Sequence, residues 1–163
     1  MKYLIPAALT LLILGIGQVS GLSTETKLVD VVDGDTIDIE NDTIRFIGID
    51  TPEISGDNAP REYGFENTTE NVECLNRYGE EASTFVENST SDQVLVIDDI
   101  RSDGRGTYRR RLSYIHSEGD LNRKLLVEGL AQVYRSDFSR KNEFYFWQYV
   151  ANKNNRGLWS CSS

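Results

Sequence analysis

Several acidic residues are spaced so that they could hold a metal ion. Asp33 and Asp35 flank a glycine, and Asp50 follows the next apolar run of the chain. Carboxylates that lie together repel one another unless a cation neutralises them, and ligand sets made only of oxygen favour a hard ion such as Ca²⁺. The Asp-Gly-Asp sequence alone is a common turn. It does not begin an EF-hand, because position 44 holds Ile where that loop needs Glu.

Arginines gather in a second part of the chain, where five of the twelve lie between residues 101 and 111. One guanidinium group can donate two parallel hydrogen bonds to two oxygens of a phosphate, and it does not lose its charge. The arginines therefore indicate a phosphate-binding segment, although, taken alone, they are more often a solvated basic loop that balances an acidic protein. Glu53 is a candidate general base or a surface acid. We assign no role to His116, the only histidine.

The composition limits the class of protein. The chain has 163 residues, 39% of them hydrophobic, a formal net charge of −9, one His and two Cys. This predicts a single domain and excludes a disordered chain, a coiled coil, a zinc finger and most histidine-centred catalysis. The acidity argues at first against a nucleic-acid partner. Because the arginines are concentrated, however, the net charge predicts weak long-range steering rather than no binding.

Short β-like runs must position the acidic residues. The sequence predicts strands over residues 28–32, 36–40 and 43–49. A tight turn at Asn41-Asp42 would place Ile37 opposite Phe46, which gives one apolar face. The same register places Asp33 opposite Asp50, so the acids converge at one end of a hairpin.

The rest of the chain predicts helices among further strands. Residues 51–77 form a long polar segment, which predicts a functional or disordered loop. We expect helices over residues 78–86, 121–128 and 139–156, and strands over residues 93–98 and 108–116. Gly129 and Gly157 end the last two helices. Five strands with interleaved helices predict a small α+β domain built on a compact barrel or sheet.

The first 22 residues differ in kind from the rest. A basic Lys2, an apolar run and a small-residue exit are typical of a secretory signal peptide. A spanning helix needs roughly 20 apolar residues, and Gln18 and Ser20 interrupt the run, so an uncleaved anchor is the less favoured alternative. We expect residues 1–22 to contact the membrane only transiently, and residues 23–163 to form a secreted domain that works outside the cytosol.

Cys74 and Cys161 fit an exported domain. They can form only one intramolecular bridge, which would close a long loop and contribute roughly 4–5 kcal/mol through loop-closure entropy. The alternative is a pair of free thiols.

Several motifs together closely resemble the staphylococcal nuclease (thermonuclease) family. They occur in the family's order and with similar spacing from about residue 27 to residue 160. The motifs are Val32 to Thr36, Arg45 to Glu53, Tyr78 to Ala82, Arg110 to Ile115, Leu121 to Ala131 and Gly157 to Trp159. The resemblance implies an α+β fold, a five-stranded OB-fold β-barrel with three α-helices. It also implies a Ca²⁺-dependent nuclease that hydrolyses DNA and RNA, which we expect to act as a monomer without an obligate protein partner.

The resemblance implies roles for the acidic residues. Asp35 and Asp50 resemble the Ca²⁺-binding carboxylates of the family, with the backbone carbonyl of Thr51 as a further ligand. Asp33 is similar to a nearby acid that supports this site. Glu53 matches the acid that activates or orients the attacking water.

The basic residues are assigned in the same way. Arg45 and Arg110 match the two arginines that clamp the scissile phosphate, and Tyr108 sits where family members carry a phosphate-contacting tyrosine. A gapped alignment would select Arg105 in place of Arg110; strand register favours Arg110. The ideal hairpin puts Arg45 on the opposite face from Asp35, so barrel twist or a bulge has to bring them together.

Two hypotheses from different classes follow. The leading one is an exported Ca²⁺-dependent endonuclease, and the alternative is a catalytically inactive OB-fold module that binds nucleic acid or protein. The complete set of acids and arginines favours the nuclease, because inactive relatives are expected to lose several of them. The pairing of Cys74 with Cys161 also resembles exported members of the family.

Overall fold

The computed structural model describes residues 22–56, 58–100 and 110–161. The predicted leader up to residue 21 lies outside the described residues, as do Tyr108 and Arg105. Within the described ranges, none of the helices combines the length and apolar character needed to cross a membrane.

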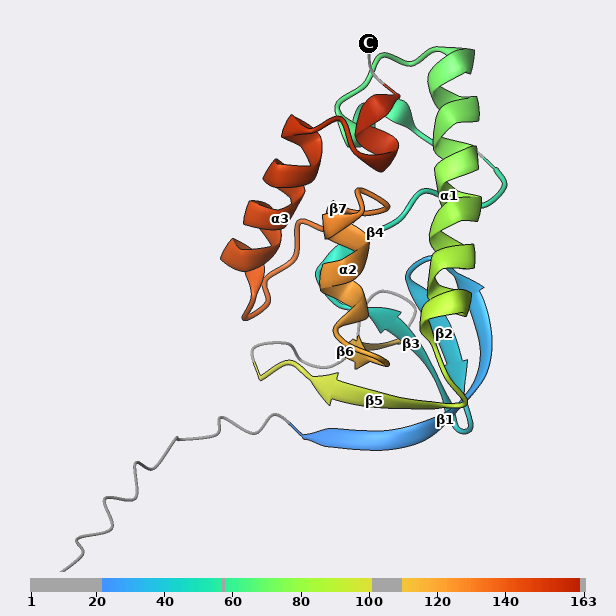
Figure 1. Ribbon diagram of the computed structural model, residues 1–163, viewed down its shortest axis with the longest axis vertical. Helices are drawn as coiled ribbons and strands as arrows, with labels where there is room; N and C mark the ends of the chain where they lie inside the picture. The colour runs from blue at the N-terminus through green and yellow to red at the C-terminus, as the bar shows by residue number, and fades with distance from the viewer. Residues whose placement is uncertain (1–21, 57, 101–109, 162–163) are drawn as a thin grey trace, which may run out of the picture.

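Five strands of the described chain close into a barrel in the order β1-β2-β3-β6-β5 (Figure 1). They are β1 (Ser23–Asp33), β2 (Thr36–Ile39), β3 (Asp42–Phe46), β5 (Gln93–Asp98) and β6 (Arg111–His116). Strands β3 and β6 pair in parallel, and the other neighbours pair antiparallel. A short antiparallel pair, β4 (Ile49–Asp50) with β7 (Gln132–Val133), stands beside the barrel. The expected five-stranded barrel is confirmed.

Three α-helices pack above the barrel (Figure 1). They are α1 (Thr69–Ser89), α2 (Leu121–Val127) and α3 (Lys141–Lys153), with the short 3₁₀ helices η1 (Pro60–Tyr63) and η3 (Gly157–Ser160) near the start of α1. The prediction that the whole segment 51–77 is a loop is wrong, because α1 begins at Thr69 rather than at Tyr78. The hydroxyl of Thr68 accepts a hydrogen bond from the N–H of Asn71 and caps the helix.

The predicted register of the β2–β3 hairpin is wrong by two residues. Ile37 pairs with Ile44 rather than with Phe46, and the turn falls one residue earlier than Asn41-Asp42. A shift of two residues leaves each side chain on the same face, because the side-chain period of a strand is two. Ile37, Ile44 and Phe46 therefore still share the buried face of the barrel, as predicted.

The interior has two hydrophobic clusters. The larger fills the barrel and the space beneath α2 and α3. The smaller lies between η1, the first half of α1 and η3, and contains Tyr63, Phe65, Leu75, Ala151, Leu158 and Trp159. The polar segment after Glu53 therefore wraps into a second small core rather than forming an open loop.

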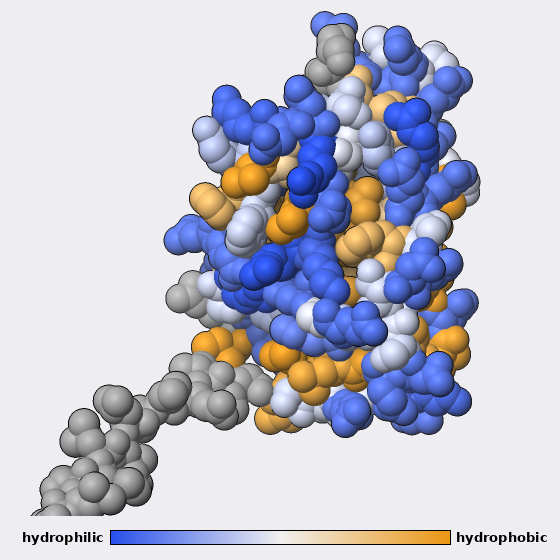
Figure 2. All heavy atoms as spheres, viewed as in Figure 1, coloured by the Kyte–Doolittle hydropathy of each residue, from blue (hydrophilic) through white to orange (hydrophobic). Residues whose placement is uncertain are grey.

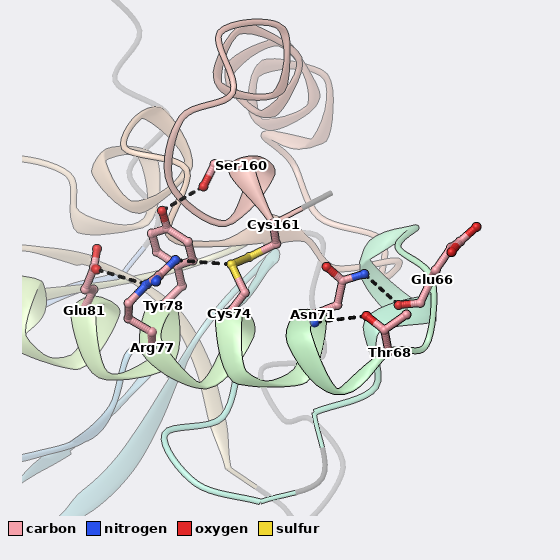
Figure 3. Close-up of a disulfide and its surroundings, with 9 residues drawn as sticks. All are labelled: Glu66, Thr68, Asn71, Cys74, Arg77, Tyr78, Glu81, Ser160 and Cys161. Atoms are coloured by element: carbon pink, nitrogen blue, oxygen red, sulfur yellow. Dashed lines mark hydrogen bonds and ion pairs between the residues drawn. A yellow bond between two sulfur atoms is a disulfide. The ribbon is translucent and has the colours of Figure 1, made fainter. Parts of the chain in front are cut away.

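A disulfide between Cys74 and Cys161 fastens this second cluster (Figure 3). It joins the first half of α1 to the end of η3, with a separation of 87 residues in the chain. Beside it the hydroxyl groups of Tyr78 and Ser160 hydrogen-bond at 2.9 Å. The predicted pairing is confirmed, and free thiols are excluded for these two residues.

The surface is mostly hydrophilic over the helices, whereas hydrophobic residues gather over the β1–β5 end of the barrel (Figure 2). Val29 and Val32 of β1 and Ile100 after β5 are exposed there. This end lies away from η1 and η3 (Figure 1).

Candidate active site

Asp35 lies in the tight turn between β1 and β2. Its N–H donates to Oδ1 of Asp33 at 2.9 Å, as in an Asx turn. The turn packs closely against α1 and the loop after β4, because a Cβ at Gly34 would lie 2.5 Å from Cβ of Ala82 and 2.9 Å from Oγ1 of Thr51. Only glycine fits in this space, which gives the Asp-Gly-Asp sequence a structural reason.

Arg45 on β3 joins the two central carboxylates. Its Nη1 donates to Oδ1 of Asp35 and its Nη2 to Oδ1 of Asp50, both at 2.6 Å. The side chain of Asp35 is 2% exposed, whereas those of Arg45 and Asp50 keep 20% and 21% of their surface. Because Asp35 belongs to a turn and not to a strand, the alternation of faces does not separate it from Arg45. The expected approach of these two residues is confirmed.

Asp35 is held from several sides. Its Oδ2 accepts the N–H of Thr51 at 3.1 Å, and its Oδ1 accepts the hydroxyl of Thr36 at 3.0 Å. Burial raises the pKa of Asp35 above its ordinary value, the charge of Arg45 acts against this, and the neighbouring carboxylates raise it further. The site thus favours additional positive charge beside this carboxylate.

Arg110 lies close to Thr36, the residue that follows Asp35. It immediately precedes β6, and its Nη1 lies 3.5 Å from Oγ1 of Thr36. The same hydroxyl group donates to Asp35. Arg45 therefore binds the buried carboxylate directly, and Arg110 lies beside the hydroxyl group that donates to it.

Asp50 is oriented by a residue that sequence reasoning missed. Gln132 pairs with Asp50 across the β4–β7 pair, and its Nε2 donates to Oδ2 of Asp50 at 3.2 Å. Nothing in the local sequence around Gln132 indicates this role, because it depends on a pairing between distant segments.

The backbone of Glu53 is held by Asn58, a second residue missed from the sequence. The Asn58 side chain accepts the N–H of Glu53 and donates to its carbonyl oxygen, both at 2.9 Å. It also donates to Oδ1 of Asn76 on α1 at 2.7 Å. Helix α1 touches the same backbone directly at Gly79, where a Cβ would lie 2.4 Å from the carbonyl oxygen of Glu53. The exposed Glu53 side chain therefore rises from a fixed backbone.

Tyr63 of η1 lies among these acids. Burial raises the pKa of its phenol, and the charges of Asp50, Asp35, Glu62 and Glu53 raise it further. Tyr63 therefore remains protonated.

The donor atoms beside Arg45 are oxygens, the kind of ligand that hard cations prefer. Asp35 and Asp50 offer carboxylate oxygens, and the backbone of Thr51 runs beside them. Among the described residues no group of three or more His, Cys, Asp or Glu could hold a metal ion. Because Ca²⁺ takes about six to eight oxygen ligands, water or phosphate oxygens would have to complete the shell.

Comparison with known proteins identifies the family. The family model described as Staphylococcal nuclease homologue matches residues 43–161. The chain belongs to this family. A thermonuclease of Staphylococcus hyicus is 30% identical over 141 residues, which cover 82% of this chain and 75% of that protein.

Two further relatives of this staphylococcal nuclease homologue come from other groups of organisms. An uncharacterized protein of Methanocaldococcus jannaschii is 36% identical over 149 residues, covering 84% of this chain and 72% of the relative. An endonuclease of Bacillus subtilis is 29% identical over 151 residues, covering 85% and 65% respectively. The predicted family membership is therefore confirmed.

Proposed function

We propose that this staphylococcal nuclease homologue is a Ca²⁺-dependent nuclease that hydrolyses phosphodiester bonds in DNA and RNA. The observation that carries the proposal is the guanidinium of Arg45 bound between Asp35 and Asp50, with Arg110 one hydroxyl group away. The names of the relatives, thermonuclease and endonuclease, support the same reaction class.

The arginines act on the phosphate. Attack by water in line with the leaving oxygen builds negative charge on the phosphate oxygens, and fixed positive groups stabilise that charge. Arg45 lies on β3 and Arg110 immediately precedes β6, which pairs with β3 in parallel, so this pairing brings the two arginines to neighbouring parts of the barrel. Guanidinium groups keep their charge throughout the pH range in which proteins are folded.

Glu53 acts on the water. A carboxylate within hydrogen-bond reach of the water orients it and accepts its proton as the new P–O bond forms. The side chain of Glu53 is exposed while Asn58 and Gly79 fix its backbone, so it can meet solvent from a defined position.

The cation is assigned to the acidic residues. Asp35, Asp50 and the carbonyl group of Thr51 would hold Ca²⁺, which when bound adds positive charge beside the phosphate oxygens. Asp33 supports this site by fixing the turn that carries Asp35.

The proposal includes the location. We expect residues 1–22 to be removed as a signal peptide and the remaining domain to work outside the cytosol as a secreted monomer. The disulfide supports this expectation, because such bonds persist in oxidising compartments and are rare in a reducing cytosol.

An inactive OB-fold module that binds nucleic acid or protein is the alternative. The nuclease is favoured because the predicted acids and arginines are all present, and Asp33, Asp35, Asp50 and Arg45 are joined by hydrogen bonds around the Asp35 turn. A binding module has no need of a general base whose backbone is held on two sides.

Cleavage of single-stranded DNA by the purified protein tests the proposal. We expect degradation with Ca²⁺, loss of activity with a chelator, and recovery when Ca²⁺ is restored. Glu53→Gln should lower the rate by several orders of magnitude at unchanged thermal stability. Glu80→Gln, which changes an exposed acid on α1, is the matched control and should cleave like the wild type. Absence of cleavage under every Ca²⁺ and salt condition would refute the nuclease.

A further inference from the structure

A groove of about 830 Å³ adjoins the candidate active site, because Asp50 is one of the residues that line it. The other lining residues come from η1, from β7 and the residues after it, and from α3 and η3. The volume falls within the roughly 300–1,000 Å³ of sites that enclose small-molecule ligands. A nucleotide-sized group therefore fits beside the proposed catalytic residues.

Aromatic side chains stand on the rim of this groove. Tyr134 and Tyr145 both line it and remain 49% and 41% exposed. Their backbones are fixed, because the N–H of Tyr134 donates to the carbonyl of Gly48 and Tyr145 lies within α3. Exposed aromatic rings on a rigid support are platforms on which unpaired bases stack.

Two arginines in the groove have no acidic partner within residues 22–56, 58–100 and 110–161. Neither Arg61 on η1 nor Arg135 after β7 forms an ion pair or side-chain hydrogen bond with any described residue. Other arginines of the described chain are occupied, by carboxylates at Arg45, Arg77, Arg111, Arg140 and Arg156, and by the ring of Trp147 at Arg123. On a protein with a net charge of −9, unpaired guanidinium groups beside aromatic rings indicate a phosphate-bearing ligand.

We propose that this groove is an extended binding site for single-stranded nucleic acid, in which Tyr134 and Tyr145 stack on bases and Arg61 and Arg135 bind phosphates. The proposal rests on the proposed function, since it assigns the groove to the strand that the nuclease cleaves. A duplex fits less well, because the faces of paired bases are already covered by their neighbours. Glu62 and Asp50 also line the groove, so stacking rather than charge supplies most of the affinity.

The groove owes its outer wall to the segment between Glu53 and α1. Tyr63 and Trp159 are buried along that wall, and Trp159 packs edge-on against Phe65 at 6.1 Å. The Cys74–Cys161 bond holds this cluster together. The segment predicted as a polar loop therefore serves as part of a binding surface.

Binding of a fluorescein-labelled single-stranded oligothymidylate, followed by fluorescence anisotropy in the presence of a chelator, tests the proposal without cleavage. Tyr145→Ala should weaken binding at least about five-fold, as expected for the loss of one base–aromatic stack. Tyr149→Ala is the matched control: it removes the same side chain from the same helix, 60% exposed but outside the groove lining, and should bind within two-fold of the wild type. Equal melting temperatures exclude loss of folding.

Salt dependence tests the arginines separately. Each phosphate contact on a single strand contributes about 0.7 to the slope of log affinity against log salt. Arg61→Gln and Arg135→Gln should each reduce the slope by about that amount. Equal affinity of Tyr145→Ala and Tyr149→Ala, an unchanged slope in both arginine variants, or equal binding of a duplex would overturn the proposal.

Failure of the groove and failure of the nuclease give different results. If the protein binds the strand through the tyrosines but cleaves nothing with Ca²⁺, the proposed function is refuted and the proposed binding role of the groove is retained. If it cleaves a dinucleotide and Tyr145→Ala leaves KM for a long strand unchanged, the binding role of the groove is refuted and the proposed nuclease activity is retained. Both proposals together expect a raised KM for the long strand at unchanged kcat for the dinucleotide. A wild-type protein that binds peptides but no oligonucleotide contradicts the groove assignment.

Discussion

Substitution of Gly79 by Ala should damage catalysis through a contact that involves no side chain of the site. A Cβ at this position would lie 2.4 Å from the carbonyl oxygen of Glu53 and 2.7 Å from that of Pro52. Ordinary contacts of this kind begin near 3.4 Å. The backbone that carries Glu53 must therefore move by about 1 Å or α1 must tilt away. Asn58 holds the same backbone through two hydrogen bonds, so the movement also strains those.

The expected size of the effect follows from two opposing terms. In an exposed helix, Gly→Ala stabilises by about 1 kcal/mol through helix propensity. Here the steric overlap opposes that gain, so the net change in the free energy of unfolding should be small or unfavourable. A misplacement of about 1 Å at a reacting group can lower the rate about 100-fold. We therefore expect kcat to fall by about this factor while the protein stays folded.

Steady-state cleavage of single-stranded DNA with Ca²⁺ measures the effect in two backgrounds. If Gly79→Ala acts by displacing Glu53, it should cost little further rate when Glu53 is already Gln, because the two changes damage the same function. Glu80→Ala, the next residue on the exposed side of α1, is the control and should leave kcat unchanged. A Gly79→Ala variant that cleaves like the wild type would refute the reasoning, and so would full additivity with Glu53→Gln.

Two predictions concern stability. Asp98→Asn should lower the free energy of unfolding by up to about 1 kcal/mol at pH 7 after solvent screening. Partial burial of Asp98 opposes its ionisation, but hydrogen bonds from Arg111 and Ser113 outweigh this and lower the pKa of Asp98. A lowered pKa stabilises the fold fully only at a pH above the pKa that Asp98 has in the unfolded chain. The difference in stability between the wild type and Asp98→Asn, measured by urea unfolding, should therefore shrink as the pH falls below about 4. A difference that grows with acidity would contradict this assignment. Cys74→Ser should lower the free energy of unfolding by about 4–5 kcal/mol, since the bond closes a loop of 87 residues. Chemical denaturation measures it, reduction of the wild type should reproduce it, and a loss below about 1 kcal/mol would show that the second cluster holds without the bond.

Much of the barrel could be predicted from alternation of residue types. Strand β5 has the expected bounds, and the buried face of the β2–β3 hairpin is the expected one even though its register is shifted. The shift went unseen because alternation has a period of two and cannot distinguish registers that differ by two residues. The parallel β3–β6 pair was not predictable from local patterns, since it joins segments far apart in the chain.

The start of α1 was missed for a compositional reason. Leu75, Gly79, Ala82 and Val86 are buried at helical spacing, which continues the pattern of the predicted helix toward the N-terminus. Polar residues between Thr69 and Arg77 concealed that pattern, and proline and glycine before them indicated a loop. The helix is stabilised there by the second cluster and the disulfide, neither of which is a local signal.

The candidate site divides in the same way. Residue types and motifs led to Asp35, Asp50, Arg45 and Arg110, because charged groups in a recognisable order carry their own signal. Two residues that hold the site, Gln132 at Asp50 and Asn58 at the backbone of Glu53, act through contacts between segments and have no such signal. The groove was likewise invisible in the sequence, since its walls come from η1, β7 and α3.

The position of the disulfide also bears on the order in which the molecule is completed. Cys161 follows every strand and helix described, so the bond can form only after all of them have been synthesised. The barrel strands end at His116, but the larger hydrophobic cluster also contains residues of α2 and α3, so the barrel and the helices complete one core. The groove wall is then the last part to be secured, and its completion depends on oxidising conditions, which the proposed export would supply.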